Sequence, residues 1–333
     1  MNATINFVNK ERLIACIEEN IPLINENNKI ENFEKKFNKI EPLKFALNSE
    51  LSILNGITKK EEELMDNETK TADKADTVEH AKTEITTEVL ENNVPESYTN
   101  SYKEVFIKNG TDYGLTEEML TPNIEINNKN VIIFHTHTCE SYTPSELYNY
   151  EQTGTYRTTD LDYSVARVGT ELEKQLKSYG FNVIHDTTYH DYPAYNGSYG
   201  RSQETVENIL NENPGYDIII DLHRDAIADY SYAPTVKIGD DYASQLMFVI
   251  GTDGGGLTHP NWNQNLKFAV KVQEKGNELY PGLFKPIILR NSRYNQQLSK
   301  GACIIEVGAT GNTLEQSITS MKYLAKVLNE IVN

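Results

Sequence analysis

The chain has 333 residues, with 31 Lys and Arg against 49 Asp and Glu, so its formal charge is −18 at pH 7. That length allows two domains or one large domain with an appendage, and the acidic balance argues against a nucleic-acid-binding protein, which needs surplus Lys and Arg to neutralise phosphates. Three widely spaced cysteines form neither a disulfide scaffold nor a thiolate zinc site, and because no apolar run reaches 18 residues we expect the chain as given to be soluble.

The first hundred residues divide into two regions by composition. Residues 1–58 carry apolar side chains at roughly helical spacing, such as Leu13, Ile17 and Ile21, which predicts a small N-terminal helical region. Residues 59–96 hold 12 acidic and 5 basic residues, with no aromatic residue and no glycine. Such a segment buries too little apolar surface to offset the entropy of ordering it. We therefore predict an acidic linker over 59–100, flexible or partly helical.

From residue 101 to 333, short β-branched runs alternate with helical patterns. Runs expected as strands are 131–134, 181–184, 217–222, 245–251, 286–289 and 302–307. Helical faces lie within 165–176, 206–210, 266–270 and 318–328. Continuous apolar strands that alternate with helices are typical of a buried, mostly parallel sheet. We therefore predict one α/β domain over 101–333, with a mostly parallel, twisted sheet flanked by helices.

Two histidines and a carboxylate follow the first of these strands. Reactive residues of open α/β sheets gather at the carboxyl ends of the strands, and His135, His137 and Glu140 come directly after 131–134. The histidines share a face if the strand continues, and Glu140 returns to the same point if the chain turns after His137. Imidazole and carboxylate without thiolate are the ligands of a catalytic zinc site with an open position. The competing interpretation is that one of these histidines is a hydrogen-bonded core or loop residue.

A second ionisable group ends the strand at 217–222. His223, Arg224 and Asp225 stand where this buried strand emerges, and His223 is a further candidate metal ligand. Asp221, on the strand itself, is a candidate for orienting an imidazole from behind. The competing interpretation is a strand-end network in which Arg224 pairs with Asp225, a surface salt bridge of little energetic weight.

Glu306 is the sharpest single candidate. Ile305 and Val307 flank it in a predicted strand, and a carboxylate is costly to bury there without a cation or a catalytic use. A metal-activated water needs a nearby base that takes its proton and later delivers it to the leaving nitrogen, and Glu306 fits that role. The competing interpretation is an edge-strand glutamate that faces solvent.

The segment 189–199 is rich in tyrosine and is followed by Arg201. It is either a stabilised loop or a wall on which tyrosine faces stack against sugars, and the sequence does not decide between them. Gly254, Gly255 and Gly256 are not followed by Lys and Ser or Thr, so they do not form a phosphate-binding loop.

Five blocks together resemble the stage II sporulation protein P family. They are VIIFHTHTCESYTP (131–144), YPAYNGSYGRSQETVENIL (192–210), DIIIDLHRDA (217–226), the GTD and HPNW stretch (251–262) and CIIEVGATGNTLEQ (303–316). The resemblance covers about residues 101–333. It implies the fold of the zinc-dependent N-acetylmuramoyl-L-alanine amidases and a cell-wall hydrolase that acts in engulfment during endospore formation.

The resemblance also implies a substrate, a metal and a partner. The expected activity is zinc-dependent cleavage of the amide between the muramic acid lactyl group and L-Ala of peptidoglycan, with an added endopeptidase activity on stem peptides. The expected partner is the lytic transglycosylase stage II sporulation protein D. The full-length protein is expected to be exported and anchored in the cell membrane, facing the cell wall or the septal intermembrane space, and the given chain is expected to lack the anchor.

Carried over residue by residue, the resemblance implies Zn²⁺ ligands at His135 or His137, with Glu140 and His223, and a catalytic carboxylate at Glu306. We favour His135 over His137 because it directly ends the strand. Arg224 is a candidate for stabilising the oxyanion. Two alternatives remain open, namely another zinc amidohydrolase or carboxypeptidase that acts on small soluble substrates, and a non-catalytic wall-binding module in which these residues are structural.

Overall fold

The structure is a computed structural model, which describes residues 86–90 and 97–332. These residues belong to one compact unit, Leu51–Asn333. The predicted N-terminal helical region, 1–58, and most of the predicted linker, 59–100, lie outside the described residues. The division of the chain into three regions therefore stays a prediction.

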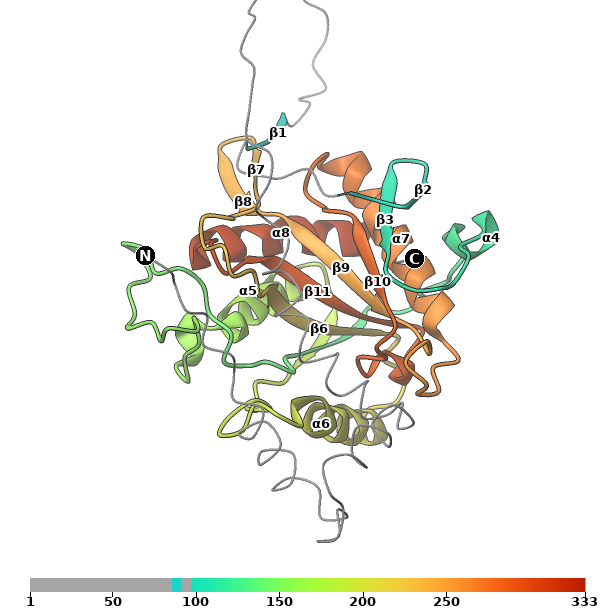
Figure 1. The fold of residues 1–333 in the computed structure, drawn as a ribbon, viewed down its shortest axis with the longest axis horizontal. Coiled ribbons are helices and arrows are strands. Elements are labelled where there is room, and N and C mark those ends of the chain that lie inside the picture. Colours follow the sequence, from blue (N-terminus) through green and yellow to red (C-terminus); the bar gives the residue numbers. More distant parts are fainter. Residues whose placement is uncertain (1–85, 91–96, 333) are drawn as a thin grey trace, which may run out of the picture. The chain divides into compact units, whose positions relative to one another are not determined.

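An eight-stranded sheet forms the centre of the described part, with strand order β2-β3-β10-β9-β11-β6-β4-β5 (Figure 1). Its strands are β2 (Asn100–Tyr102), β3 (Val105–Asn109), β4 (Asn130–Phe134), β5 (Asn182–His185), β6 (Ile218–Asp225), β9 (Leu246–Gly251), β10 (Ile287–Arg290) and β11 (Gly301–Ala309). The predicted strands correspond to β4, β5, β6, β9, β10 and β11. Because β6 runs to Asp225, His223 lies within the strand rather than after it.

The strands form two parallel blocks. β5, β4, β6 and β11 run parallel to one another, as do β3, β10 and β9. The blocks meet antiparallel where β9 pairs with β11, and β2 adds antiparallel at the edge. The predicted α/β class with a mostly parallel sheet is thus confirmed. The antiparallel join was not predicted: β9 lies beside β11, which separates it from β6, and runs opposite to both.

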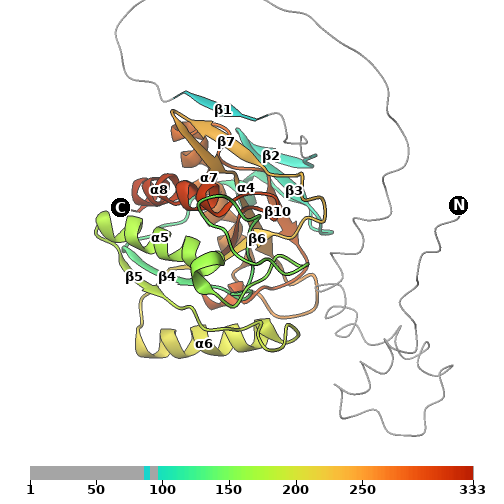
Figure 2. The same ribbon diagram turned by 90° about the vertical axis from the view of Figure 1, so that its left-hand side faces the viewer.

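Helices cover both faces of the sheet. The long helices of the described part are α5 (Val165–Ser178), α6 (Ser198–Glu212), α7 (Trp262–Leu279) and α8 (Leu314–Ile331), and the short ones are α4 (Glu117–Leu120), η2 (Leu161–Tyr163) and η3 (Gln296–Leu298). Figure 2 shows α6 on one side of the sheet and α5 and α8 on the other. The Ser164 side chain caps α5, and Thr313 with Gln316 forms a capping box on α8. None of the described helices combines the length and hydrophobicity that a membrane span requires.

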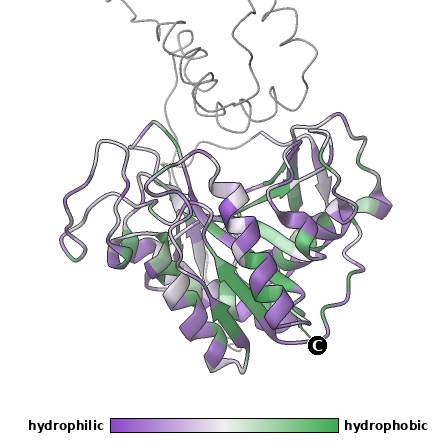
Figure 3. Ribbon diagram, turned by 90° about the horizontal axis from the view of Figure 1, so that it is seen from below, coloured by the Kyte–Doolittle hydropathy of each residue, from purple (hydrophilic) through white to green (hydrophobic). Residues whose placement is uncertain are grey.

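The hydrophobic core lies in layers on the two sides of the sheet. Val131 and Ile133 of β4 pack with Leu172 beneath α5, whereas Ile132 packs with Val206 beneath α6. This is the two-residue alternation of a strand whose two faces are both buried. Figure 3 shows hydrophobic strands between helices whose other faces are hydrophilic. Two adjacent residues of a strand therefore lie in different chemical surroundings.

A small antiparallel sheet stands beside the large one, with order β1-β7-β8. Its strands are β1 (Thr87–Val89), β7 (Thr235–Ile238) and β8 (Asp241–Ser244). β1 falls within the predicted linker, so the expectation of a flexible or helical segment is wrong for these residues. These residues pair with β7 and pack closely against Gly282. A Cβ built on this glycine would lie only 2.5 Å from the Cγ2 methyl of Val89.

Candidate active site

Polar side chains of β6 and β11 gather on the face of the sheet that α6 covers. The parallel pairing places Glu306 beside His223, and Phe134 beside Asp221. Paired residues of neighbouring strands point to the same face, as do residues two apart in one strand. Phe134 belongs to the layer beneath α6, so Asp221, His223 and Glu306 all lie on the α6 face.

A turn after β4 brings His137 to the same face. β4 ends at Phe134, and the Glu140 N–H donates to the His137 carbonyl at 3.0 Å. The His137 ring then meets the His223 ring edge-on, with 5.1 Å between centroids. The buried Nδ1 atom of His137 has no hydrogen-bond partner among the described residues. Since burial lowers the pKa of His137 to about 4, the ring is neutral near pH 7 and can offer a lone pair.

Glu140 is a buried anion beside His223. Its Oε2 atom lies 3.5 Å from Nδ1 of His223 and accepts the Arg224 N–H at 3.3 Å. Burial disfavours the charged carboxylate, but the guanidinium of Arg224 and the imidazole of His223 outweigh it and hold the pKa of Glu140 well below its usual range. The carboxylate is therefore ready to face a cation.

His223 lies between two carboxylates, one at each ring nitrogen. Its Nε2 atom is 2.8 Å from Oδ1 of Asp221, an ion-pair contact without hydrogen-bond geometry. Asp221 accepts the Thr136 N–H and hydroxyl, both at 2.7 Å. Burial disfavours the imidazolium, but Asp221 and Glu140 raise the pKa of His223 well above its ordinary value. Asp221 thus stands behind His223, and its proposed role in orienting the imidazole stays a prediction.

Glu306 supplies a third carboxyl group near His223. Its Oε2 atom is buried and has no hydrogen-bond partner in the described part of the chain. Burial raises the pKa of Glu306 to about 8, and the carboxylates of Asp225 and Glu140 act in the same direction against His223. A carboxyl group in this state can both accept and return a proton near neutral pH.

The geometry favours His137 over His135 as a ligand, the reverse of the preference drawn from the sequence. His135 follows Val131 and Ile133 onto the face beneath α5. Its Nδ1–H donates to the Leu222 carbonyl at 2.8 Å, and its Nε2 lies 2.9 Å from Nε2 of His185. Both ring nitrogens are engaged, and burial lowers the pKa of His135 to about 3. His135 is the hydrogen-bonded core histidine that the competing interpretation described.

Arg224 is directed at Glu140 and at the backbone that follows it. Its Nε donates to the Ser141 carbonyl at 3.0 Å, and its Nη1 lies 3.9 Å from Oε1 of Glu140. Asp225, the next residue, has Nζ of Lys285 at 3.7 Å. These contacts give Arg224 a role in holding Glu140, and they do not support the expected role at an oxyanion.

The sequence matches a known protein family. A family model described as Stage II sporulation protein P matches residues 14–329. The chain belongs to this family. The Stage II sporulation protein P of Bacillus subtilis (strain 168) is 30% identical over 222 residues, which are 61% of this chain and 51% of that protein. The chain therefore spans about half the length of the curated relative that it matches.

Solved structures similar to this family member include two amidases. One is the CwlD amidase from Clostridioides difficile in complex with the GerS lipoprotein, with 14% identity, a TM-score of 0.38 and coverage of 61% of this chain and 95% of that one. The other is the catalytic domain of CwlV, an N-acetylmuramoyl-L-alanine amidase from Bacillus (Paenibacillus) polymyxa var. colistinus, with 12% identity, a TM-score of 0.36 and coverage of 60% and 94%.

The side chains of this Stage II sporulation protein P family member fit a divalent cation in chemistry. Within residues 86–90 and 97–332, no three His, Cys, Asp or Glu side chains form a ready metal site. The structure nevertheless brings together a neutral imidazole with a buried, unpaired Nδ1 on His137, the anion of Glu140, and the Nδ1 of His223 that faces this anion. Two imidazoles and a carboxylate suit Zn²⁺ with an open position.

Sequence reasoning missed the contact between His137 and the loop that joins β5 to α6. The Tyr195 hydroxyl lies 3.0 Å from Nε2 of His137, and the two rings stack with 4.5 Å between centroids. The signal for this contact was the tyrosine-rich segment 189–199. This segment was interpreted as a stabilised loop or a sugar-binding wall, and neither interpretation predicts a contact with His137.

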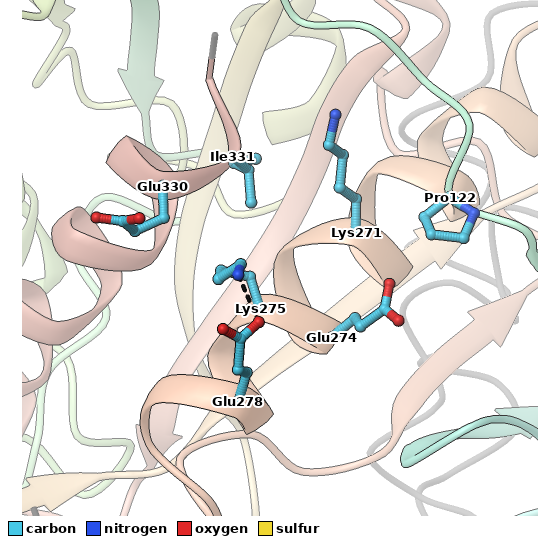
Figure 4. A pocket seen from close by; sticks show the side chains of 7 residues that line it. All are labelled: Pro122, Lys271, Glu274, Lys275, Glu278, Glu330 and Ile331. Carbon is cyan, nitrogen blue, oxygen red and sulfur yellow. Dashed lines mark hydrogen bonds and ion pairs between the residues drawn. The ribbon is translucent and has the colours of Figure 1, made fainter.

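A pocket of about 280 Å³ lies elsewhere, between α7 and α8 beside Pro122 (Figure 4). Its lining includes Lys275 and Glu278, which pair with each other, and Glu330, which pairs with Lys326. None of its described lining residues belongs to the site on the α6 face. We therefore assign the pocket no part in the chemistry.

Proposed function

We propose that this Stage II sporulation protein P family member is a zinc-dependent peptidoglycan hydrolase that cleaves the amide between the muramic acid lactyl group and L-Ala. Family membership supports a role in sporulation. The observation that most supports a hydrolase is the position of Glu306 beside His223. Its buried Oε2, which has no hydrogen-bond partner among the described residues, lies on the same face as two imidazoles and the anionic Glu140.

The proposed zinc ligands are His137 and His223, each through Nδ1, and Glu140. A bound Zn²⁺ at these residues would polarise the scissile carbonyl and lower the pKa of a water molecule. The Asp221 carboxylate, 2.8 Å from Nε2 of His223, would favour a proton on that nitrogen and leave Nδ1 to bind, since a carboxylate behind a ligating histidine fixes its tautomer. Arg224 holds Glu140 by its backbone N–H and its guanidinium.

Glu306 is the proposed general base and acid. Its Oε2 takes the proton from the attacking water and returns it to the nitrogen of the departing L-Ala, so that this nitrogen leaves as an amine. Its place in β11, one strand from His223, fixes the carboxyl group on the rigid sheet. A rigid support matters because an error of about 1 Å in the position of a catalytic group can cost on the order of 100-fold in rate.

Further proposals follow from the family resemblance alone. They are an endopeptidase activity on stem peptides, action in engulfment together with stage II sporulation protein D, and an exported, membrane-anchored full-length protein that faces the cell wall or the septal intermembrane space. Both activities are amide hydrolyses that need the same base and the same metal, so the same residues would serve both.

The test is mass spectrometry of the fragments that the zinc-loaded chain releases from purified peptidoglycan. We expect glycan strands with free lactyl groups and stem peptides with free L-Ala amino termini. Fragments cut only within the stem peptides would replace the amidase with the endopeptidase. Hydrolysis of small acyl-peptides without release from peptidoglycan would identify another amidohydrolase. A chain that binds no zinc and releases nothing would be a non-catalytic module.

A further inference from the structure

The segment 186–197 joins β5 to α6 and packs against the turn that carries His137 and Glu140. Each contact is polar and specific. The Thr138 hydroxyl donates to the Thr188 carbonyl at 2.6 Å, and His190 donates from Nδ1 to the His135 carbonyl at 2.7 Å. Because the 186–197 loop bonds to successive residues of the turn, the position of the turn depends on the loop.

The loop in turn is fixed by Arg201 of α6. The Arg201 guanidinium donates from Nε to the His190 carbonyl at 2.6 Å and from Nη1 to the Asn196 carbonyl at 3.1 Å. A planar guanidinium that binds several carbonyls of one loop orders that loop at little further entropic cost. The contacts favour the stabilised-loop interpretation of the tyrosine-rich segment.

Asp191 connects the loop both to the turn and to Arg157. Its side chain is fully buried and pairs with Arg157, whose own side chain is 23% exposed. The same carboxylate accepts the Cys139 N–H, with 3.2 and 3.3 Å to its two oxygens. Cys139 stands between His137 and Glu140. A single buried carboxylate thus holds the backbone of the turn at the residue before Glu140.

Tyr195 contacts His137 directly and contacts Arg157 as well. Its hydroxyl meets Nε2 of His137, and its ring stacks on the imidazole at an interplanar angle of 13°. The Arg157 guanidinium carbon lies 5.0 Å from the centroid of the same tyrosine ring, within the range of a cation–π contact. Asp191, Arg157 and Tyr195 therefore form a continuous set of contacts that ends on the imidazole.

The hydroxyl contact gives Nε2 of His137 a partner in either tautomer, and ligation through Nδ1 would select the tautomer with the proton on Nε2. A histidine nitrogen that binds a metal has no proton, so when Nδ1 is the ligand the ring proton is on Nε2 and is donated to the Tyr195 oxygen. The unpaired state of Nδ1 within the described residues agrees with this assignment. A second, independent contact, the ring stacking, sets the plane of the imidazole.

We infer that Tyr195, Arg157 and Asp191 are positioning residues for the zinc ligand His137, in which Tyr195 fixes the Nε2–H tautomer and Asp191 with Arg157 holds Tyr195 and the turn in place. This inference rests on the proposed function, because it presupposes that His137 binds Zn²⁺. None of the three residues contacts the substrate in this assignment. They act through the metal affinity and the orientation of the imidazole.

The test compares Tyr195→Phe with Tyr192→Phe in the full chain. The first change removes the hydroxyl and keeps the stacked ring, and the second removes a hydroxyl from an exposed tyrosine of the same loop. Zinc affinity is measured by competition with a chromophoric chelator. We expect Tyr195→Phe to weaken binding by about 10- to 100-fold, the usual effect of losing such a partner, and Tyr192→Phe to leave it unchanged.

A second measurement reads the tautomer directly. Nitrogen-15 NMR of the histidine side chains, with the His137 signals assigned by their loss in His137→Asn, should show a protonated Nε2 and a metal-bound Nδ1 in the zinc-loaded wild type. We expect Asp191→Asn to weaken zinc binding too, and Tyr195→Phe keeps the test decisive if Asp191→Asn fails to fold.

The outcomes separate this inference from the proposed function. Equal zinc affinity of Tyr195→Phe and wild type, or zinc bound through Nε2 of His137, would overturn the inference and leave the zinc hydrolase standing. A wild-type chain that binds no zinc would overturn the proposed function and this inference with it. A selective loss of affinity in Tyr195→Phe, with the Nε2–H tautomer in the wild type, would support both.

Discussion

The two faces of the eight-stranded sheet each carry a pair of histidines, and the pairs differ in the groups that surround them. On the α5 face, His135 and His185 bond to each other, and His135 also bonds to backbone. On the α6 face, His137 and His223 meet edge-on, and His223 lies between two carboxylates. Burial lowers the pKa of His135, whereas the carboxylates raise that of His223. The His-Thr-His motif does not tell a candidate ligand from a core residue. The charges around each ring and the hydrogen-bond partners of its nitrogens do.

The largest expected effect comes from the carboxyl group on the α6 face. Glu306→Gln keeps the shape of the side chain and removes its ability to exchange a proton. We expect hydrolysis of peptidoglycan to fall by about 100- to 10,000-fold, the usual contribution of a general acid–base group, with zinc content and melting temperature unchanged. Turnover equal to that of the wild type would remove Glu306 from the mechanism.

Removing one histidine from each face should produce different defects. His137→Ala deletes a proposed ligand, so we expect the purified chain to lose stoichiometric zinc and its activity. His135→Ala should retain zinc but lower the free energy of unfolding by about 2–4 kcal/mol, because it leaves a cavity and takes away the partner of Nε2 of His185. Metal analysis and chemical denaturation measure the two effects. If His135→Ala lost zinc and His137→Ala kept it, the zinc site would lie on the α5 face and the proposal would be wrong.

Two helix glycines offer a matched pair, one on each face. A Cβ on Gly169 of α5 would lie 2.6 Å from Nε2 of His185 and 2.8 Å from Nε2 of His135, whereas a Cβ on Gly200 of α6 meets nothing within 4 Å among the described residues. We expect Gly169→Ala to destabilise the fold by about 1–3 kcal/mol through overpacking. Gly200→Ala should be neutral or stabilise by up to about 1 kcal/mol. Thermal denaturation of the two variants would contradict the account if their order were reversed.

The smallest expected effect lies at the outer end of the α5-face pair. Oε2 of Glu173 is 3.4 Å from Nδ1 of His185, and its side chain is 24% exposed. Because solvent screens such a pair, we expect Glu173→Gln to change the free energy of unfolding by less than about 1 kcal/mol and to leave activity intact. A large loss of activity would show that the α5 face takes part in the chemistry.

Much of the fold could be predicted from the sequence because its strands are long apolar runs. Ile218–Ile220 and Ile304–Ile305 are β-branched segments, which favour a strand over a helix. The buried faces of α5 and α8 follow from the helical spacing of their apolar residues. The faces of the sheet could not be assigned in the same way. Both sides of β4 are buried, so no polar alternation shows that His135 faces α5 while Phe134 faces α6.

The residues of the site that the sequence identified are those fixed by strands. His223 and Glu306 lie on β6 and β11, whose pairing brings them together. The contributions of His137 and Tyr195 depend on a turn and a loop, and their approach is set by hydrogen bonds to Asp191 and Arg201 that no local pattern encodes. The antiparallel join of β9 with β11 was missed for a similar reason, since apolar runs carry no sign of strand direction.

The measurement that tests the central claim most directly is a crystal structure of the zinc-loaded chain with anomalous diffraction recorded at the zinc edge. The account predicts a peak on the α6 face, bounded by Nδ1 of His137, Nδ1 of His223 and the Glu140 carboxylate, with Glu306 beside it. A peak between His135 and His185 on the α5 face, or no zinc peak at these residues in a chain that hydrolyses peptidoglycan, would contradict it.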